Sequence, residues 1–315
     1  MRLLIVIVNY RTAGLTIDCL RSLAPEVGAA GARVVVTDNL SGDDSIAQIQ
    51  QAIDANDWSA WASLQPLDRN GGFAYGNNAA IRPALQSEHP PEYILLLNPD
   101  TIVRPGALTA LSDFLDCHPD VGIVGSRLEH PDGVPQRSAF RFPSVLGEFE
   151  AGMRLGFVSR CLAGKVVAPP VPERACQTDW VAGASMMIRR EVFERIGLMD
   201  ERYFMYYEEV DFCLRAYRAG WLCWYAPASR VVHLVGQSSG VTDAKKVKKR
   251  RPAYWFESRQ RFFLTHFGHV RTFIANMAWG LAFATYRLRS AIQRKPDTDP
   301  AYLWRDLMRW SFCNM

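Results

Sequence analysis

The sequence predicts an α/β fold in which a mainly parallel central sheet is covered by helices on both faces, with a helical extension at the C-terminal end. Three observations support this. Apolar, strand-like runs alternate with segments of helical spacing through residues 2–117, as in βαβ units. Most of the runs are apolar throughout, as in strands buried on both faces. The chain of 315 residues is 49% hydrophobic and 22% charged, which suits a sizeable core.

The first half supplies the expected strand–helix repeat. Strands are expected over residues 2–8, 33–37, 60–66 and 93–97, and helices over 12–23, 43–53 and 105–117. We expect Ser41 as the N-cap of the second helix and Pro105 in the first turn of the third. A glycine-rich turn, RNGGFAYGNNAAI at 69–81, enters a further helix. Ligands of such sheets bind beyond the carboxyl ends of the strands, so the residues after each strand form the candidate site.

The N-terminus resembles a signal peptide only in part. Its apolar run is about six residues long and no small-residue cleavage site follows, so we interpret it as the first buried strand. The seven cysteines are odd in number and include no Cys-x-x-Cys. This argues against a disulfide framework or a zinc site and favours a reducing cytoplasm.

The second half is less regular and changes in charge. We expect a loop over 131–144, a strand over 179–189, a helix over 208–218, and short strands within 221–227 and 229–235. Residues 244–315 carry 15 Lys and Arg against 4 Asp and Glu, whereas the rest carries 21 against 28. We therefore expect a catalytic domain over 1–240 and a basic, aromatic-rich helical extension over 241–315.

Two aspartates, Asp38 and Asp100, directly follow expected parallel strands. Either alone is explained by a turn or a helix cap. Together with the glycine-rich segment 70–73 at the same edge, they indicate a site of nucleotide size. A dinucleotide dehydrogenase is excluded because the turn after the first strand, VNYRTAGLT, holds a single glycine, and no P-loop is present.

The chain also carries seven motifs in a fixed order: IVNY, TDN, NGGFAYGNN, LLLNPD, VAGASMMIRREVF, GLMDERYFMYYEEVDFCLRAYRAGW and VVHLVGQSS. Together they resemble the family 2 inverting glycosyltransferases, and among these the bacterial rhamnosyltransferase-like enzymes of surface polysaccharide assembly. The resemblance covers residues 3–265. It implies a GT-A fold, the fold of nucleotide-diphospho-sugar transferases.

The resemblance implies a nucleotide site at the ends of the first strands. Asp38 would contact the base, and a carboxylate there accepts equally from the N3–H of uracil or of thymine, so UDP and dTDP both stay open. The two glycines after Asn70 would allow close backbone approach. The nucleotide-binding candidates are Asn9, Asp38, Asn70, Gly71, Gly72 and Asn98.

The family's Asp-x-Asp motif reads Asn98-Pro99-Asp100 in this chain. The resemblance implies that Asp100 holds a divalent metal, Mn²⁺ or Mg²⁺, which neutralises charge on the departing diphosphate. Because Asn98 carries no charge, further ligand strength is expected from His233, which matches a metal-coordinating histidine of the family. By itself His233 would be interpreted as a hydrogen-bonded histidine at a strand end.

An inverting transfer also needs a carboxylate that takes the proton of the acceptor hydroxyl. The resemblance assigns this role to the second residue of an acidic pair, which is Glu209 here in place of the usual aspartate. Glu208 and Asp211 are the next candidates for the base. Acidic residues at a helix N-terminus also suit the helix dipole, and we expect Asp211 to pair with Arg215 four residues on.

Three residues of the WVAGASMM motif, Trp180, Gly183 and Ala184, match the loop that lines the donor sugar and the acceptor. An ordinary core aromatic is the alternative for Trp180. Arg137 is a further candidate for phosphate binding, although a solvated arginine is the simpler interpretation.

The extension begins with KKVKKRR at residues 245–251, six positive charges in seven residues. No helix-turn-helix, RNA-binding sheet or zinc module accompanies it, so we expect no nucleic acid partner. A solvated charged face is the plain alternative to a contact with an anionic membrane surface, which we favour. The uncharged segment 272–286 is shorter than the roughly 20 residues of a membrane span and predicts an interfacial helix.

The sequence as a whole predicts a metal-dependent inverting glycosyltransferase that moves a sugar from a nucleotide donor to a hydroxyl of a lipid-linked or surface glycan. The resemblance favours dTDP-L-rhamnose, with UDP-galactofuranose or another UDP-hexose as alternatives. The expected location is cytoplasmic, at the inner face of the membrane. The rival is a non-catalytic nucleotide-sugar-binding homologue, suggested by the changes at Asn98 and Glu209. A nucleotidyltransferase is disfavoured because the basic glycine-rich loop after the first strand is missing.

Overall fold

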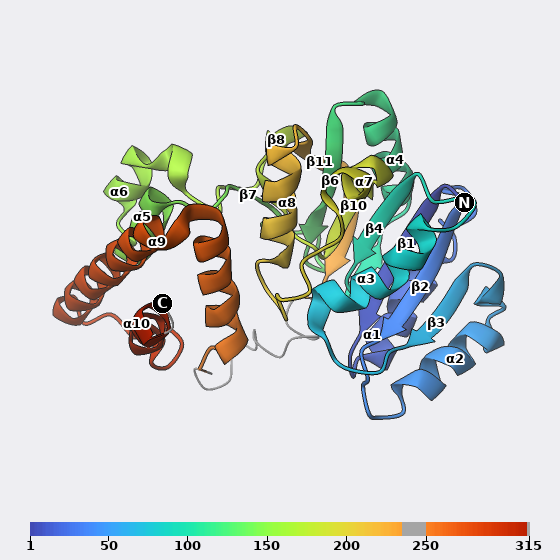
Figure 1. Cartoon of the computed structure of the whole chain (residues 1–315), viewed down its shortest axis with the longest axis horizontal. Coiled ribbons are helices and arrows are strands. Elements are labelled where there is room, and N and C mark those ends of the chain that lie inside the picture. The colour runs from blue at the N-terminus through green and yellow to red at the C-terminus, as the bar shows by residue number, and fades with distance from the viewer. Residues whose placement is uncertain (235–249, 314–315) are drawn as a thin grey trace. The chain divides into compact units, whose positions relative to one another are not determined.

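The computed structural model describes residues 1–234 and 250–313 (Figure 1). Within them the chain forms two compact units. The first is built from residues 1–140, 170–204 and 208–234, and the second from 141–169, 205–207 and 250–313. The second unit thus draws on residues 141–169 as well as on the C-terminal segment, which a single boundary near residue 240 does not anticipate.

The first unit is built on a nine-stranded sheet. Its strands are β1 (Leu3–Asn9), β2 (Ala32–Asp38), β3 (Ala62–Pro66), β4 (Tyr93–Leu97), β5 (Thr101–Val103), β6 (Val121–Glu129), β8 (Cys176–Thr178), β10 (Ser185–Arg189) and β11 (Leu222–His233). Their order is β3-β2-β1-β4-β10-β6-β11-β5, with β8 added beside β11. Strands β1 to β4 are parallel neighbours and so are β6 and β11, whereas β5, β8 and β10 run antiparallel to their partners. The expected mainly parallel sheet is confirmed.

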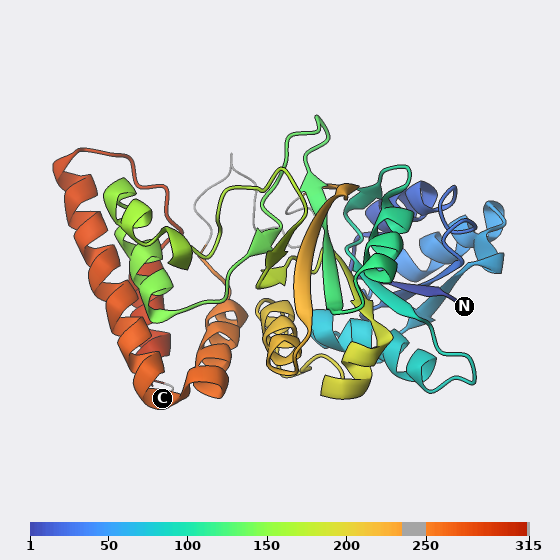
Figure 2. The ribbon, with the colours of Figure 1, turned by 90° about the horizontal axis from the view of Figure 1, so that it is seen from above.

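Helices cover both faces of this sheet, as Figure 2 shows. They are α1 (Ala13–Leu23), α2 (Ser45–Ala55), α3 (Gly72–Leu85), α4 (Ala107–Cys117), α7 (Arg190–Ile196) and α8 (Glu208–Arg218), with a 3₁₀ turn η1 (Trp58–Ala60). Side chains alternate between the two faces along each strand. Ile5 and Ile7 share a core with α1, α2 and α4. Val8 meets Gly76 of α3, and Met186 meets Cys213 of α8, on the other face.

The central strands are fully buried, which explains their unbroken apolar sequence. Every residue of β1 and of β4 is buried between helices. Each Leu, Ile or Val removed from water there contributes about 1.5–3 kcal/mol to folding. The burial places the polar residues that end these strands at a rigid edge.

Two expected helix starts are wrong. Helix α2 begins at Ser45 with Asp44 as its N-cap, so Ser41 lies outside the helix. Its hydroxyl is bonded instead to Asp38, which competes with capping. Helix α4 begins after Gly106, whose φ of 79° is left-handed, so Pro105 precedes the helix.

The strands expected in the second half are divided differently in the structure. The chain turns at residues 182–184, so the strand expected over 179–189 becomes two. One is β10, and the other is β9 (Trp180–Val181), which forms a separate two-stranded sheet with β7 (Ala139–Phe140). The two short strands expected over 221–235 are one strand, β11, with an irregularity between Ala226 and Arg230.

The second unit is helical. It contains α5 (Val145–Met153), α6 (Gly156–Cys161), η2 (Ala163–Lys165), α9 (Ala253–Ile292) and α10 (Leu303–Cys313). Helix α9 bends at Gly268, whose φ of 72° and ψ of 174° are not helical. Helix α5 packs on α9, and Arg259 of α9 donates to Glu148 of α5 at 2.7 Å and to Asn276 at 2.6 Å. This buried, hydrogen-bonded charge pair ties α5 to both halves of α9.

The uncharged segment 272–286 lies within α9. One side of it, including Ala275, Trp279 and Phe283, is buried in the core of the second unit. Other side chains of α9, among them Ile274 and Leu281, are exposed. In the described part of the chain, no helix combines the length and the apolar character that a membrane crossing needs.

Candidate active site

The site is built at the carboxyl edge of the parallel strands, as in other open α/β sheets. Asn9 ends β1 and Asp38 ends β2, and the two residues are register partners. Strand β4 ends at Leu97, and the turn 98–100 follows. His233 ends β11. The sheet therefore brings four separate parts of the sequence to one edge.

The carboxylate of Asp38 is buried and held by three hydrogen bonds. It accepts from Asn9 Nδ2 at 2.6 Å, from Ser41 N at 2.9 Å and from Ser41 Oγ at 2.6 Å. Asn9 Oδ1 accepts in turn from the hydroxyls of Thr12 and Thr16 at 3.0 and 2.9 Å. These bonds fix Asp38 before any ligand arrives. Asn9 orients Asp38, and a direct contact of Asn9 with a nucleotide stays a prediction.

The glycine-rich turn makes a close approach within the first unit. Gly72 has a φ of 84°, and a Cβ built there would lie 1.8 Å from the carbonyl oxygen of Phe204. Phe73 N donates to that oxygen at 3.0 Å, and the side chain of Asn70 accepts from Gly72 N at 3.2 Å. Glycine at 72 is thus required by the fold itself. The nucleotide contacts of Asn70, Gly71 and Gly72 stay predictions.

Asp100 and His233 lie side by side, although they are far apart in the sequence. Asp100 Oδ1 is 3.5 Å from His233 Nε2, and Asp100 is 1% exposed. Strand β5 explains the approach, because Thr101 pairs with His233 in the antiparallel β5–β11 ladder. The structure thus brings together the two predicted metal ligands.

Hydrogen bonds from neighbouring residues hold the turn that carries Asp100. Thr101 Oγ1 donates to Asn98 O at 2.7 Å, and Asn98 N donates to Ala184 O at 3.1 Å. Cys19 Sγ lies 3.4 Å from Thr101 Oγ1, and burial raises the pKa of this thiol to about 12, so it is a neutral packing group. Among the described residues, no hydrogen bond of the Asn98 side-chain amide to the protein is found. That amide is available to a ligand.

The loop before β10 reaches the same edge because β10 runs antiparallel to β4, with Ser185 opposite Leu97. A Cβ built on Gly183 would lie 3.2 Å from the ring of Phe73 and 3.9 Å from Cβ of Glu209. Gly183 therefore leaves space between the glycine-rich turn and the start of α8. Trp180 stacks on Phe140 with ring centroids 4.2 Å apart. The sugar-lining roles of Trp180, Gly183 and Ala184 stay predictions.

The three acidic residues of α8 have different surroundings. Asp211 accepts from Arg215 Nε at 2.8 Å, which confirms the expected pairing of these two residues. Glu208 is 4% exposed. Glu209 has its Oε2 shielded from solvent and without a hydrogen-bond donor in the described part of the chain. Burial raises the pKa of Glu209 from 4.5 to about 7. A carboxylate that titrates near neutral pH suits proton acceptance.

Several positions around the site were not anticipated from the sequence. Ser41 holds Asp38, and Gln136 Nε2 donates to the carbonyl oxygen of His233 at 2.8 Å. Ser41 could have been found, since Asp and Ser side chains commonly form local hydrogen bonds in turns. Gln136 lies in an irregular loop and offers no such signal. Its neighbour Arg137 is exposed, in keeping with the simpler interpretation given above.

The Asp100–His233 pair fits a divalent ion in donor type. Adjacent ligands at about 2.1 Å from a metal lie about 3 Å apart, so the observed separation of 3.5 Å requires little adjustment. Carboxylate and imidazole suit Mn²⁺ readily. Within residues 1–234 and 250–313, no group of three or more His, Cys, Asp or Glu is placed to hold a metal. In that part of the chain, Asp100 and His233 are therefore the two side chains that we predict as ligands of a metal ion.

A family model described as "Glycosyltransferase like family 2" matches residues 2–261. The chain belongs to glycosyltransferase family 2. An N-acetylglucosaminyl-diphospho-decaprenol L-rhamnosyltransferase of Mycobacterium tuberculosis is 31% identical over 163 residues, 47% of this chain and 49% of the relative. The match thus spans about half the length of that relative. The dTDP-rhamnosyl transferase RfbF of Shigella flexneri is 25% identical over 269 residues, 84% of this chain and 80% of the relative. The resemblance to rhamnosyltransferase-like members of family 2 is confirmed.

A solved structure supports the fold of this family 2 chain. Mannosyltransferase PcManGT from Pyrobaculum calidifontis, in complex with GDP-Man and Mn²⁺, aligns with a TM-score of 0.57 at 15% identity. The alignment covers 93% of this chain and 75% of that protein. At this identity the likeness shows the fold alone, and the GT-A fold predicted from the sequence is confirmed.

Proposed function

We propose that this chain is an inverting glycosyltransferase that moves a sugar from a nucleotide donor to a hydroxyl group of a glycan acceptor. One observation carries the proposal. A single edge of the sheet holds the fixed carboxylate Asp38 and the Asp100–His233 pair, and the proton-accepting candidate Glu209 of α8 lies beside Gly183 in the loop that reaches this edge. Membership of family 2 supports it.

In the proposed reaction, the acceptor oxygen bonds to the anomeric carbon of the donor sugar. The bond from that carbon to the diphosphate oxygen breaks, and its electron pair leaves with the diphosphate. The proton of the acceptor hydroxyl passes to the carboxylate of Glu209, whose raised pKa matches this task. Attack on the side opposite to the diphosphate inverts the anomeric carbon.

Asp100 and His233 would hold a divalent ion, Mn²⁺ or Mg²⁺, at this edge. When bound, such an ion stabilises the negative charge that develops on the departing diphosphate. The Mn²⁺ named for the mannosyltransferase of the same fold supports this assignment. Asn98 adds a hydrogen-bonding group beside the pair without a second charge.

The favoured donor is dTDP-L-rhamnose, because the relatives from M. tuberculosis and S. flexneri are named as rhamnosyltransferases. UDP-galactofuranose or another UDP-hexose is the alternative, since Asp38 accepts from uracil as well as from thymine. A panel of nucleotide sugars with Mn²⁺ or Mg²⁺, followed by mass spectrometry of the products, tests this. Absence of transfer and of donor hydrolysis with every donor would contradict the proposal.

The metal assignment is tested by three matched variants. Asp100→Ala and His233→Ala are expected to raise the Mn²⁺ concentration for half-maximal turnover about tenfold or more, because each removes a direct ligand. Asn98→Ala is the control from the same turn and is expected to change it far less. An equal response of all three variants would refute the metal role of Asp100 and His233.

The acceptor is proposed to be lipid-linked and to be met at an anionic membrane surface. Five exposed apolar side chains follow one face of α9 at spacings of four and seven residues: Val270, Ile274, Leu281, Leu288 and Ile292. Their fractional exposures run from 46% to 74%. An apolar stripe on a chain segment with a large excess of basic residues suits insertion among anionic lipids.

Flotation of the full chain with lipid vesicles tests the membrane contact. We expect binding to vesicles that contain phosphatidylglycerol, weaker binding to phosphatidylcholine alone, and loss of binding when Leu281→Asp and Leu288→Asp are combined. Tyr217→Asp, at an exposed apolar position of α8 in the first unit, is the control. If the double variant floats like the unaltered chain, this face of α9 is not the contact surface.

A further inference from the structure

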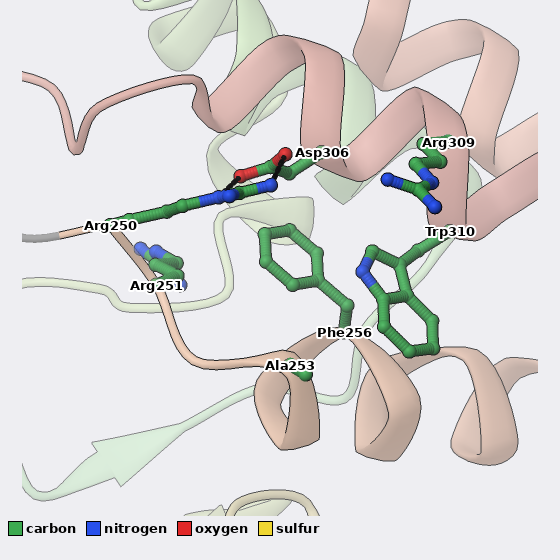
Figure 3. Close-up of a pocket in the computed structure, with 7 residues that line it drawn as sticks. All are labelled: Arg250, Arg251, Ala253, Phe256, Asp306, Arg309 and Trp310. Atoms are coloured by element: carbon green, nitrogen blue, oxygen red, sulfur yellow. Dashed lines mark hydrogen bonds and ion pairs between the residues drawn. The ribbon is translucent and has the colours of Figure 1, made fainter.

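The second unit contains a cavity that the proposed transfer reaction does not use. Its volume is about 440 Å³, within the range of small-ligand sites. It is formed by the two residues before the N-cap of α9, by the start of α9 and by α10. The lining residues are Arg250, Arg251, Ala253, Phe256, Asp306, Arg309 and Trp310 (Figure 3).

The charges around this cavity do not balance. Asp306 is the one acid among the lining residues and is 2% exposed. Arg250 occupies both of its carboxylate oxygens, with Nε and Nη2 each 2.6 Å away. This bidentate pair sets the single negative charge of Asp306 against Arg250, so the three arginines of the lining outnumber the acid by two.

Arg251 and Arg309 have no carboxylate partner in the described part of the chain. The guanidinium of Arg251 lies 4.1 Å from the centre of the Trp255 ring. Burial lowers the pKa of Arg251, because its charge is withdrawn from water and the weaker attraction of Tyr207, Tyr206 and Asp299 does not offset that cost. Arginine nevertheless stays charged at neutral pH. An anion in the cavity would therefore gain a charge-assisted hydrogen bond and relieve a desolvated cation.

The rest of the lining is apolar: Ala253 and two aromatic side chains, Phe256 and Trp310. The rings of Phe256 and Trp310 are nearly parallel, 5° between planes with centroids 6.5 Å apart. Figure 3 shows them next to each other, beside the guanidinium groups of Arg309 and Arg250. Phe256 belongs to the apolar core of the unit, and Trp310 packs against that core. A ligand that combined an anionic head with an apolar chain would match both halves of this lining.

We propose that this cavity binds the phosphate or diphosphate group of an amphiphile, with Arg251 and Arg309 on the anion and Phe256 and Trp310 on the first part of the apolar chain. The start of α9 borders the cavity and adds a weaker favourable field for the anion. The site consists of residues outside the candidate active site. Its occupancy does not depend on sugar transfer.

Calorimetric titration of the full chain, with EDTA present and dTDP in excess, tests the proposal. The probes are farnesyl diphosphate, inorganic diphosphate and farnesol. Farnesyl diphosphate is expected to bind, inorganic diphosphate to bind more weakly, and farnesol to show no saturable binding. EDTA and dTDP exclude binding through a metal or at the nucleotide site.

Arg251→Gln and Arg309→Gln are each expected to weaken farnesyl diphosphate binding about tenfold, the loss of one charge-assisted hydrogen bond. Arg305→Gln is the matched control, since Arg305 is exposed on the same helix α10 and does not line the cavity. Arg309 is exposed as well, so Arg309→Gln keeps the test decisive if Arg251→Gln fails to fold. Unchanged binding in folded Arg309→Gln, or equal binding of farnesol, would overturn the proposal.

Vesicles then distinguish two sources of the amphiphile. Phosphatidylcholine vesicles with and without phosphatidic acid are added as competitors of farnesyl diphosphate. Competition that requires phosphatidic acid identifies a membrane phospholipid as a source, whereas its absence restricts the site to prenyl diphosphates. Competition by phosphatidylcholine alone would contradict a site that selects a phosphate monoester or diphosphate.

Discussion

Asp38 and Glu209 are both carboxylates of the candidate active site, and their surroundings are opposite. Asp38 accepts three hydrogen bonds from Asn9 and Ser41 and is fully buried. Glu209 has a shielded oxygen without a donor in the described part of the chain, and burial raises its pKa to about 7. A carboxylate that accepts three hydrogen bonds is held in place, whereas a buried one without a donor is ready to exchange a proton. In the proposed function, the same chemical group serves as a rigid ligand contact at Asp38 and as a base at Glu209.

The largest effect is expected from a substitution of Glu209, the carboxylate that we propose as the base. Glu209→Gln is expected to lower turnover by about 10²–10⁴-fold while donor binding persists, because the amide cannot accept the acceptor proton. Initial rates and calorimetric donor affinity measure the two quantities. Glu208→Gln is the neighbouring control and is expected to retain much more activity. Full turnover in Glu209→Gln would transfer the role of the base to Glu208 or Asp211.

The pH dependence of turnover comes next in size. With a pKa of about 7 for Glu209, the ionised fraction falls about tenfold per pH unit below 7. Turnover at pH 5 is therefore expected to be about 100-fold lower than the maximum reached above the pKa. The raised pKa also means that the neutral carboxyl favours the folded state. This stabilisation is present in full below the unfolded pKa of 4.5 and is lost as the pH rises through about 7. A flat rate profile between pH 5 and 8 would exclude Glu209 as the titrating base.

Removal of the Asp38 carboxylate is expected to lower the stability of the fold. Asp38→Ala leaves three buried donors without their acceptor and should lower the free energy of unfolding by about 2–4 kcal/mol. Urea denaturation measures this. Asp113→Ala, at an exposed position of α4, should change stability by less than about 0.5 kcal/mol. Similar losses in both variants would mean that the hydrogen bonds of Asp38 do not stabilise the fold.

The smallest effect is expected at Ser41. Ser41→Ala removes the hydroxyl that donates to Asp38 at 2.6 Å but keeps the backbone donor of the same residue. We expect a loss of about 1 kcal/mol by urea denaturation and a weaker donor affinity. Ser87→Ala, whose hydroxyl bonds to the protein at the exposed end of α3, serves as the comparison. A loss as large as that of Asp38→Ala would show that Ser41 alone organises the cluster.

The parts of the fold that follow from periodicity could be predicted from the sequence. Strand β4 and helix α8 have the expected bounds, because an unbroken apolar run and an amphipathic spacing leave little choice. Strand β6 was not expected, since Gly122 and Gly125 interrupt its apolar run. In the structure these glycines make room for Trp221 and Val181, a reason that only the packing reveals.

The residues of the candidate site could be predicted from the sequence, but the hydrogen bonds and strand pairing that hold them in place could not. The resemblance paired Asp100 with His233, and the β5–β11 ladder supplies the physical cause of their approach. The bonds of Ser41 and Gln136 depend on contacts between distant segments, which local patterns do not encode. The sequence of the uncharged segment 272–286 does not reveal that one side of it is buried in the protein. An apolar helix face has the same sequence pattern whether it packs on protein or on lipid.

The position of β10 in the sheet has a consequence for how the molecule folds. β10 lies between β4 and β6, although it follows both in the chain. During synthesis β1 to β4 can pair as soon as they emerge, but β6 finds its place beside them only after residues 185–189 have been made. The Asp100–His233 pair waits longer still, for β11. We therefore expect the Asp38 end of the candidate site to form early on the ribosome, and the Asp100–His233 end to be among the last contacts of the first unit to close.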